Sequence, residues 1–491
     1  MLRGRPPDGT ADDHAALGSV TTVRDDLAMT TDLPWQGDAC SLVDAFRSGE
    51  RSPIEELDAT LAAIERSELN AWSHLDADAA REAAASADVS LPFGGVPIGV
   101  KELDHVAGWP FTQASVPLAD QVSAYDSTKI TRLREAGAVL AGMTTASEFG
   151  GVNLTRTLLN GITRNPWDPE RTPGGSSGGT ASAVAGGEVT LGTAGDGGGS
   201  IRIPAGFTGM VGLKVTYGRI PRGPHAELGS LAAVPGCISR SVRDTARWLD
   251  VCNGHDRRDP LSLPRVEGWE AGLGSHLDSL RGARVAVIPD FADAVVADDV
   301  VEIVEELGAW LTERFGWHRR TVEVRIPSMG TAWALAGLVS EFAALGDRWP
   351  ACEDQLTPQI RHGLRFAHGR YGLEARIMVE RRRTELFEAM ADLFDEVDLV
   401  VTATNPDVAF AATGPLPDTF GGKAADAGNN GRLTIPANLY GNPGISIPAG
   451  SVGGLPVGIQ VMAPHHQEAR LLDVALLVER ERPWPLVSAR R

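Results

Sequence analysis

Two glycine- and serine-rich segments hold the residues of this sequence that are best suited to nucleophilic chemistry. The first runs from Gly174 to Ala185 and the second from Gly195 to Pro204. In the second segment, three consecutive glycines can turn several backbone N–H groups toward one point, which suits a developing oxyanion. Ser200 follows these glycines directly and is therefore a candidate nucleophile beside its own oxyanion hole.

A serine needs a base before it can act as a nucleophile. The eleven histidines include no pair four residues apart, so no helical metal site is predicted. Lys101 follows the short apolar run 95–100, which is typical of a buried strand. Burial at that point can lower the pKa of the lysine toward 7, so that its neutral amine accepts a proton. A solvated lysine at the end of a strand is the alternative interpretation.

The glycine-rich segments allow three other interpretations. Both could be surface loops. A phosphate-binding loop is disfavoured because neither segment is followed by Gly-Lys-Ser/Thr. The run from Gly175 to Gly179 also matches the G-x-S-x-G nucleophile elbow, with Ser177 as the nucleophile. That elbow requires a preceding strand, and residues 164–173 contain three prolines, which a central strand does not tolerate.

The elements that must position these residues alternate between helix and strand, which predicts an α/β fold with a large mixed sheet surrounded by helices. A capping box at Ser52 to Glu55 starts one helix. Residues 331–397 read as almost continuous helix and are expected to form a cap beside the sheet. We expect a single domain over 34–491, with its catalytic core at about 90–250, preceded by a mobile tail over 1–33. Met29 is a second candidate for the natural start, which leaves open whether residues 1–28 belong to the native protein.

Composition excludes several classes of protein. The 45 basic and 64 acidic residues give a formal net charge of −19, which repels nucleic acid and anionic membranes. The four cysteines are scattered without a C-x-x-C pair, as expected of free thiols in a reducing compartment. No run approaches the roughly 18 apolar residues of a membrane helix, and the start lacks a secretory apolar region. We expect a cytoplasmic protein without metal or cofactor.

Taken in order, these segments resemble the signature of the amidase signature family. Ser176 and Ser200 lie 24 positions apart, and each piece is weak alone but specific in combination. The resemblance implies the fold of that family, with a helical cap. The matching pieces are Gly95–Leu103, Asn165–Trp167, Gly174–Gly179, Asp196–Pro204, Gly212–Lys214 and Gly441–Pro448. At two positions the chain departs from the residues common in the family: Gly195 stands in place of threonine and Val215 in place of proline. Neither is a triad residue, so these departures leave open only the subfamily.

The resemblance also implies residue roles. Ser200 corresponds to the nucleophile, Lys101 to the general base that starts neutral, and Ser176 to a serine that shuttles the proton between them. The peptide between Gly175 and Ser176 is expected to be cis. The implied oxyanion donors are the backbone N–H groups of Gly197, Gly198 and Gly199, and the supporting residues are Gly175, Ser177, Asp196 and Arg202.

The activity implied is hydrolysis of the C–N bond of a small neutral amide or carbamate, urethanes included, by a monomer or homodimer. The alternative is a glutaminase-type component of a tRNA-dependent amidotransferase. A catalytically inactive scaffold is disfavoured because all three triad positions are intact. Several residues could border an apolar pocket, although aromatic residues at helical spacing more often belong to the core. These are Trp333, Leu338, Phe342, Trp349, Phe366, Tyr371, Leu228–Leu231 and Thr402–Asn405.

Overall fold

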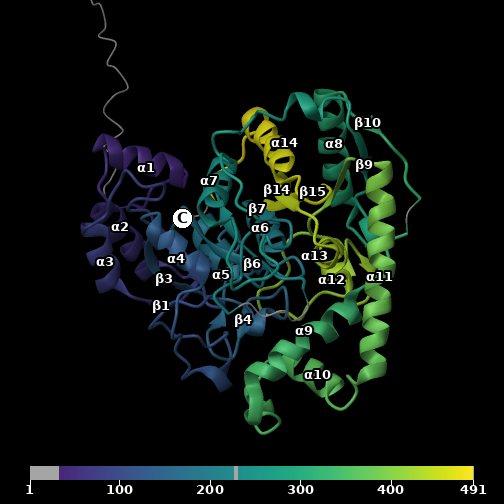
Figure 1. Ribbon diagram of the computed structural model, residues 1–491, viewed down its shortest axis with the longest axis horizontal. Coiled ribbons are helices and arrows are strands. Elements are labelled where there is room, and N and C mark those ends of the chain that lie inside the picture. Colours follow the sequence, from purple (N-terminus) through teal and green to yellow (C-terminus); the bar gives the residue numbers. More distant parts are fainter. Residues whose placement is uncertain (1–32, 226–230, 324, 490–491) are drawn as a thin grey trace, which may run out of the picture.

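A large mixed β-sheet organises the molecule (Figure 1). The computed structural model describes residues 33–225, 231–323 and 325–489. Within them, eleven strands form this sheet: β1 (Trp72–Leu75), β2 (Pro97–Lys101), β3 (Val139–Thr144), β6 (Leu191–Asp196), β7 (Val211–Lys214), β8 (Val234–Ser239), β9 (Arg284–Val287), β10 (His318–Arg319), β11 (Leu399–Ala403), β14 (Gly444–Val452) and β15 (Leu455–Met462). Their order across the sheet is β1-β3-β2-β6-β8-β7-β14-β15-β11-β9-β10.

The two strands that carry the predicted chemistry lie next to each other. β2 lies between β3 and β6 and is parallel to both. Because parallel strands end at the same edge of a sheet, Lys101 at the end of β2 and Asp196 at the end of β6 are brought to one side. Two further pairs of short strands lie outside the large sheet: β4 (Arg156–Thr157) with β5 (Gly161–Ile162), and β12 (Thr419–Phe420) with β13 (Lys423–Ala424).

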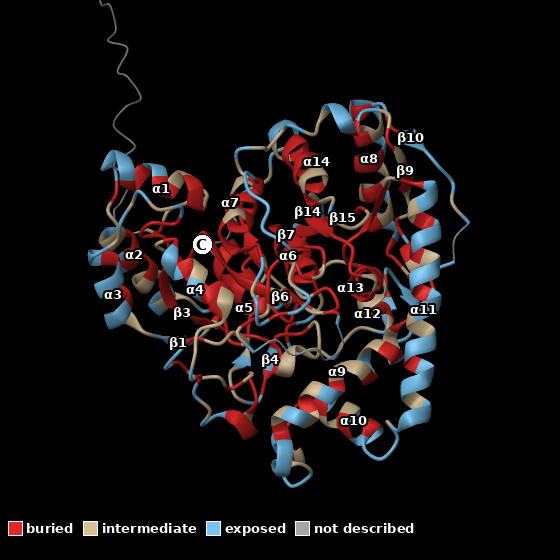
Figure 2. Cartoon of the chain, viewed as in Figure 1, coloured by how far each residue is buried: buried red, intermediate tan, exposed pale blue. Residues whose placement is uncertain are grey.

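Helices cover this sheet and also lie within the central region, where Figure 2 shows most residues buried. The capping box is confirmed: Ser52 N–H donates to Glu55 Oε2 at 2.8 Å, and Glu55 N–H donates to Ser52 Oγ at 3.3 Å.

The α-helices outside the cap region are α1 (Ala39–Ser48), α2 (Pro53–Arg66), α3 (Ala77–Ala85), α4 (Thr128–Glu135), α5 (Gly178–Ala185), α6 (Arg202–Thr208), α7 (Val242–Cys252), α8 (Asp298–Phe315), α12 (Asn429–Arg432), α13 (Ile435–Tyr440) and α14 (Glu468–Glu481).

Residues 178–185 of the first glycine-rich segment form helix α5, and residues 174–177 before it are buried, so this segment is not a surface loop. Every residue of α5 is buried, because its glycine, alanine and serine side chains are small enough for close packing against neighbouring elements. α5 contacts β2 and β6, the strands that end at Lys101 and Asp196. The turn before this helix is thereby held beside the ends of both strands.

The predicted cap region consists of three helices, α9 (Gly330–Leu345), α10 (Pro358–Ala367) and α11 (Leu373–Glu396). Figure 1 shows α9 and α10 together at one end of the molecule, with α11 running along its side. Pro358 occupies the first turn of α10, where the missing N–H of proline is tolerated. The region expected as almost continuous helix over 331–397 is therefore helical, but residues 346–357 and 368–372 divide it into three α-helices.

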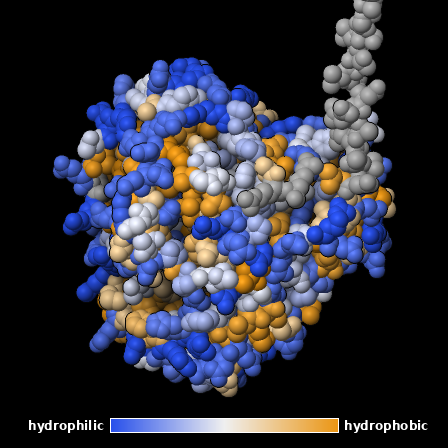
Figure 3. Space-filling model, turned by 180° about the vertical axis from the view of Figure 1, so that it is seen from behind, coloured by the Kyte–Doolittle hydropathy of each residue, from blue (hydrophilic) through white to orange (hydrophobic). Residues whose placement is uncertain are grey.

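On the face that Figure 3 shows, the surface is mostly hydrophilic and carries separate apolar areas. Among the described residues, no helix combines the length and the apolar character that crossing a membrane requires. Of the tail predicted over 1–33, only residue 33 belongs to the described part.

Candidate active site

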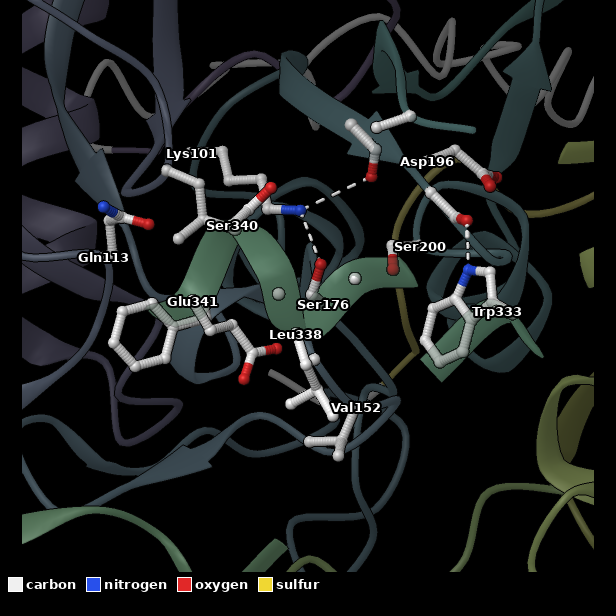
Figure 4. A pocket seen from close by; sticks show the side chains of 18 of the residues that line it. Lys101, Gln113, Val152, Ser176, Asp196, Ser200, Trp333, Leu338, Ser340 and Glu341 are labelled. Carbon is white, nitrogen blue, oxygen red and sulfur yellow. Dashed lines mark hydrogen bonds between the residues drawn. The ribbon is translucent and has the colours of Figure 1, made fainter. Parts of the chain in front are cut away.

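Lys101 lies at the carboxyl end of β2 and is buried, with 3% of its surface exposed. Its Nζ donates a hydrogen bond to Ser176 Oγ, which Figure 4 shows, and another to Ser177 Oγ, both at 2.8 Å. Its backbone N–H donates to Thr193 Oγ1 of the neighbouring strand at 2.7 Å, which anchors the strand end. The interpretation of Lys101 as a solvated residue is therefore excluded.

The environment of Lys101 favours its neutral form. The pKa of Lys101 is lowered to about 7, chiefly because burial disfavours the ammonium ion. Asp104 opposes this shift and Lys129 adds to it, but these two residues form an ion pair with each other at 2.6 Å. A substantial fraction of Lys101 is therefore uncharged at neutral pH and able to accept a proton.

Ser176 and Ser177 occupy the turn that leads into α5. The Gly175–Ser176 peptide is cis, as the family resemblance implies. Lys101 reaches both hydroxyl groups at the same distance, but only Ser176 lines the cavity described below. Ser177 is fully buried, and Gly195 N–H donates to its Oγ at 3.4 Å. A substrate cannot reach Ser177, so the nucleophile elbow centred on it is excluded.

Ser200 lies between the end of β6 and the start of α6 and is partly exposed. It lines the same cavity as Lys101 and Ser176, and Figure 4 shows all three side chains around it. Within the described residues, the Ser200 hydroxyl has no hydrogen-bond partner, so it is free to meet a ligand. The structure thus brings together the three residues of the predicted triad.

Asp196 and Arg202 form a buried ion pair beneath the loop that carries Ser200. Arg202 Nε lies 2.9 Å from Asp196 Oδ2, and both side chains are fully buried. Burial raises the pKa of Asp196, but the Arg202 guanidinium and a hydrogen bond from Asn438 outweigh it and hold this pKa well below its usual range. The carboxylate also accepts the N–H groups of Gly199 and Ile201, so it anchors both ends of the turn around Ser200.

The backbone donors near Ser200 differ from the predicted set. The Gly199 N–H already donates to Asp196 Oδ1 at 2.7 Å, so it is unavailable to an oxyanion. In the described part of the chain, the N–H groups of Gly197, Gly198 and Ser200 have no hydrogen-bond partner. The prediction is corrected accordingly: the N–H groups available to an oxyanion are those of Gly197, Gly198 and Ser200, and the Gly199 N–H is not among them.

Two side chains from distant segments hold the carbonyl groups of this loop. Trp333 Nε1 in α9 donates to the Gly197 carbonyl at 2.6 Å, and Thr434 Oγ1 donates to the Gly198 carbonyl at 2.6 Å. Because the C=O and N–H of one trans peptide point in opposite directions, the Trp333 bond also fixes the direction of the Gly198 N–H. The Thr434 bond fixes the Gly199 N–H in the same way.

Close packing explains two of the three glycines. A side-chain carbon at Gly198 would lie 2.7 Å from the Trp333 ring. Gly199 has a φ of 127°, which favours glycine, and a side-chain carbon there would lie 2.4 Å from Thr434 Oγ1. At Gly197 the nearest atom would be 3.5 Å away, an ordinary contact. The glycine-rich sequence therefore reflects the close approach of α9 and of the segment before α13.

The site opens into a cavity of about 430 Å³ between the ends of the central strands and helix α9. Of the six predicted pocket residues on the cap, Trp333 and Leu338 line this cavity. Three others pack against the hydrophobic core: Phe342, Trp349 and Tyr371. Phe366 is instead 45% exposed at the surface.

The other two segments expected at the cavity do not supply it. Thr402–Asn405 is buried and does not line the cavity; Asn405 Nδ2 donates to the Ile203 carbonyl and so supports α6. In Leu228–Leu231, only Leu231 lies within the described residues. The prediction for Thr402–Asn405 is therefore wrong, because burial between elements of the core takes these side chains away from the cavity.

Many lining residues were not identified from the sequence, among them Gln113, Phe149 and Glu341. Gln113 and Phe149 both have positive φ, 48° and 52°, and Phe149 N–H donates to the Gln113 carbonyl at 3.0 Å. Their sequence contains no signal for this conformation. Glu341 lines the cavity from α9. Its signal is the helical spacing of Trp333, Gly337 and Glu341, which places an acidic residue on a face that lies against the site.

Comparison with known proteins agrees with this geometry. The family model described as Amidase matches residues 55–472. A glutamyl-tRNA(Gln) amidotransferase subunit from Lacticaseibacillus paracasei is 32% identical over 479 residues, covering 90% of this chain and 96% of that protein. A bacterial aryl acylamidase of the amidase signature family superposes with a TM-score of 0.84 at 27% identity, covering 91% and 97% of the two chains.

A second solved structure allows a contrast within the family. The corresponding glutamyl-tRNA(Gln) amidotransferase subunit from Thermotoga maritima superposes with a TM-score of 0.76 at 26% identity, covering 94% of this chain and 98% of that one. The family model covers most of the chain, and the solved relatives share its sheet and surrounding helices. The chain therefore belongs to the amidase family and is an amidase signature hydrolase.

Proposed function

We propose that this enzyme hydrolyses the C–N bond of small amides or carbamates, urethanes included, through an acyl-enzyme on Ser200. The observation that carries the proposal is the position of Lys101: it is buried, has a pKa lowered to about 7, and bonds Ser176 in the cavity that contains Ser200. The enzyme acts alone as a monomer or homodimer in the cytoplasm, without metal or cofactor.

The reaction follows from this arrangement. Neutral Lys101 accepts the proton of the Ser176 hydroxyl while Ser176 takes the proton of Ser200, whose oxygen attacks the substrate carbonyl carbon. The N–H groups of Gly198 and its neighbours stabilise the oxyanion that forms. The proton then returns through Ser176 to the leaving nitrogen, and the C–N bond breaks.

Water completes the cycle by attacking the acyl-enzyme, with Lys101 and Ser176 again taking and returning its proton. With a urethane, cleavage of the C–N bond releases an amine and leaves an alkoxycarbonyl group on Ser200. Its hydrolysis gives a carbonic half-ester, which loses CO₂ and yields an alcohol. Amides and urethanes thus present the same carbonyl carbon and nitrogen leaving group to one set of residues.

A glutaminase component of an amidotransferase is the second candidate. It is favoured by the 32% identity to the Lacticaseibacillus paracasei protein. The stand-alone hydrolase is favoured by the higher TM-score with the aryl acylamidase, 0.84 against 0.76 for the Thermotoga maritima structure. The net charge of −19 also disfavours a chain that must approach tRNA.

One assay separates the two candidates. The purified chain is tested on acyl p-nitroanilides, on aryl urethanes and on glutamine. We expect turnover of an anilide or urethane by the chain alone, because the described site is assembled entirely from its own residues. Ammonia release from glutamine that depends on added amidotransferase partners, without turnover of the other substrates, would overturn the proposal.

The pH profile tests the neutral lysine. We expect kcat/KM on an uncharged anilide to rise with pH through a midpoint near 7, because only deprotonated Lys101 accepts a proton. Below the midpoint the rate should fall about tenfold per pH unit. Glu341 also lines the cavity, and burial raises its pKa to about 8. The profile is therefore repeated with Glu341→Gln, and loss of the rising limb in that variant would assign it to Glu341 instead.

Trp333 is expected to act as a positioning residue. Trp333→Phe keeps an aromatic ring but removes the donor to the Gly197 carbonyl, so the Gly198 N–H loses its fixed direction. We expect kcat to fall about tenfold with KM changed less than about twofold, because only the transition state carries the oxyanion. Trp349→Phe is the matched control, since that indole donates to His368 away from the cavity. An increase in KM alone would indicate a role in substrate contact only.

A further inference from the structure

The cap contributes an unpartnered carboxyl group to the cavity. Glu341 lies in α9 and lines the cavity, with 8% of its surface exposed. Its Oε2 is buried without a hydrogen-bond partner. Within the described residues, Oε1 also accepts no hydrogen bond, and no cation pairs with the group. Figure 4 shows this carboxyl group among the lining side chains, near Leu338 and Val152.

Among the described residues, the charged neighbour that affects Glu341 is another carboxyl group, Glu148. Glu148 is already satisfied: Ser115 Oγ donates to its Oε1 at 2.6 Å, and the Thr357 N–H donates to its Oε2 at 2.8 Å. Burial, and then the nearness of Glu148, raise the pKa of Glu341 to about 8. Without a ligand, Glu341 is therefore mostly protonated at neutral pH.

Basic residues on the elements around α9 are engaged elsewhere. Lys101 bonds the two serines, and Lys129 pairs with Asp104. Arg222, which lines the same cavity, donates to the Tyr217 hydroxyl at 3.3 Å. Four arginines of α10 and α11 form ion pairs with acidic residues at the surface. The pairs are Arg361 with Asp354, Arg365 with Glu353, Arg376 with Glu380 and Arg382 with Glu385. Arg383 in α11 donates to the Leu231 and Leu439 carbonyls. The remaining titratable groups on these helices, such as His362 and Glu374, are exposed.

A buried carboxyl group without a partner costs about 1–3 kcal/mol of stability, so packing does not account for an acid at this position. The walls beside it are apolar or lack a side chain. A carbon built on Gly151 would lie 3.3 Å from Glu341 Oε1, and Leu338, Val152 and Ile360 line the same cavity. This combination suits a methylene chain that ends in a hydrogen-bond donor carrying positive charge.

We propose that Glu341 selects substrates that carry a protonated primary amine on an alkyl chain, with the ammonium group donating hydrogen bonds to the Glu341 carboxylate. This inference rests on the proposed function for the reaction itself and revises the expected neutral substrate: the scissile amide or carbamate is neutral, and the charge lies at the far end. Binding requires ionised Glu341, so the group releases its proton to the solvent as the ammonium enters.

The test measures binding and turnover separately. Isothermal titration calorimetry compares n-hexylammonium with 1-hexanol at pH 7, in two buffers of different ionisation enthalpy. We expect the intact protein to bind hexylammonium at least about tenfold more tightly than hexanol, with the release of close to one proton. Glu341→Gln should abolish both the preference and the proton release. Glu374→Gln, an exposed residue of α11, is the control and should retain both.

Turnover is then compared for 5-aminopentanoyl and hexanoyl p-nitroanilide, which differ only in a terminal ammonium or methyl group. We expect kcat/KM to favour the amino substrate at least about tenfold, and Glu341→Gln to abolish this preference, while the control Glu374→Gln should retain it. Absence of turnover with intact hexylammonium binding would contradict the proposed function alone. Equal binding of hexylammonium and hexanol by the intact protein would overturn the role of Glu341.

A third variant guards against misfolding. Glu341→Asp keeps the charge but withdraws it by one methylene group, so the preference for hexylammonium should fall yet remain above that of Glu341→Gln. Thermal unfolding of all variants is followed by circular dichroism. If Glu341→Gln keeps the hexylammonium preference while folding normally, the proposal is wrong; if it fails to fold, the Glu341→Asp result decides in its place.

Discussion

Ser200→Ala should lower kcat on an acyl p-nitroanilide by at least about four orders of magnitude. The substitution removes the oxygen that would form the acyl-enzyme, while the backbone donors of the loop stay in place. The fold should survive, because the Ser200 hydroxyl makes no hydrogen bond within the described residues. Steady-state kinetics and a circular dichroism melt of the variant measure the two effects.

Ser340 offers a matched control for this experiment. It is a serine of α9 that lines the same cavity, and Ser340→Ala should retain kcat within about threefold of the parent enzyme. A fluorophosphonate probe followed by peptide mass spectrometry should label Ser200 in the parent and nothing in Ser200→Ala. Labelling of Ser176 or Ser177, or more than about 1% residual activity in Ser200→Ala, would refute the assignment.

Lys101→Met should lower kcat/KM by about 10² to 10⁴ at pH 7, the range that a general base contributes. Methionine nearly preserves the volume of the buried stem but cannot accept a proton, so the effect reports on the base and little on packing. Activity of the variant should recover partly as the pH rises, because hydroxide can replace the missing amine. The measurement is a pH series of kcat/KM on an uncharged anilide.

Lys214 allows a stringent comparison. It is also fully buried, and burial lowers its pKa to about 7, yet its Nζ donates to the Val215 carbonyl and the residue does not line the cavity. Lys214→Met should therefore keep kcat/KM within about tenfold and should leave the rising limb of the pH profile unchanged. If the two variants lose activity equally, burial of a lysine, and not its contact with Ser176, would explain the result.

Much of the site could be predicted because its residues lie in short motifs. Lys101 ends an apolar run, and the small residues before and within α5 permit close packing wherever that helix lies. The strand that ends at Lys101 was predicted from the apolar run 95–100. β8 was not, because Pro235 and Gly236 make its sequence resemble a turn; pairing with β6 and β7 on its two sides holds it in the sheet.

Long-range contacts explain what could not be predicted. The Gly199 N–H is occupied because Asp196 folds back onto it, and the direction of the Gly198 N–H depends on Trp333, which lies more than a hundred residues further along the chain. Ser176 and Ser177 are adjacent in sequence and equally close to Lys101, and only the shape of the cavity separates them. None of these distinctions is contained in a local pattern.

The amino-acid sequence is thus sufficient for the reactive groups and for the family, because a nucleophile, a base and a tight glycine turn are defined by residue type and short spacing. The folded chain alone decides which groups are neutral, which donors are free and what the cavity accepts. Those properties depend on removal from water and on partners brought from distant segments, as the lowered pKa of Lys101 and the unpartnered carboxyl of Glu341 illustrate.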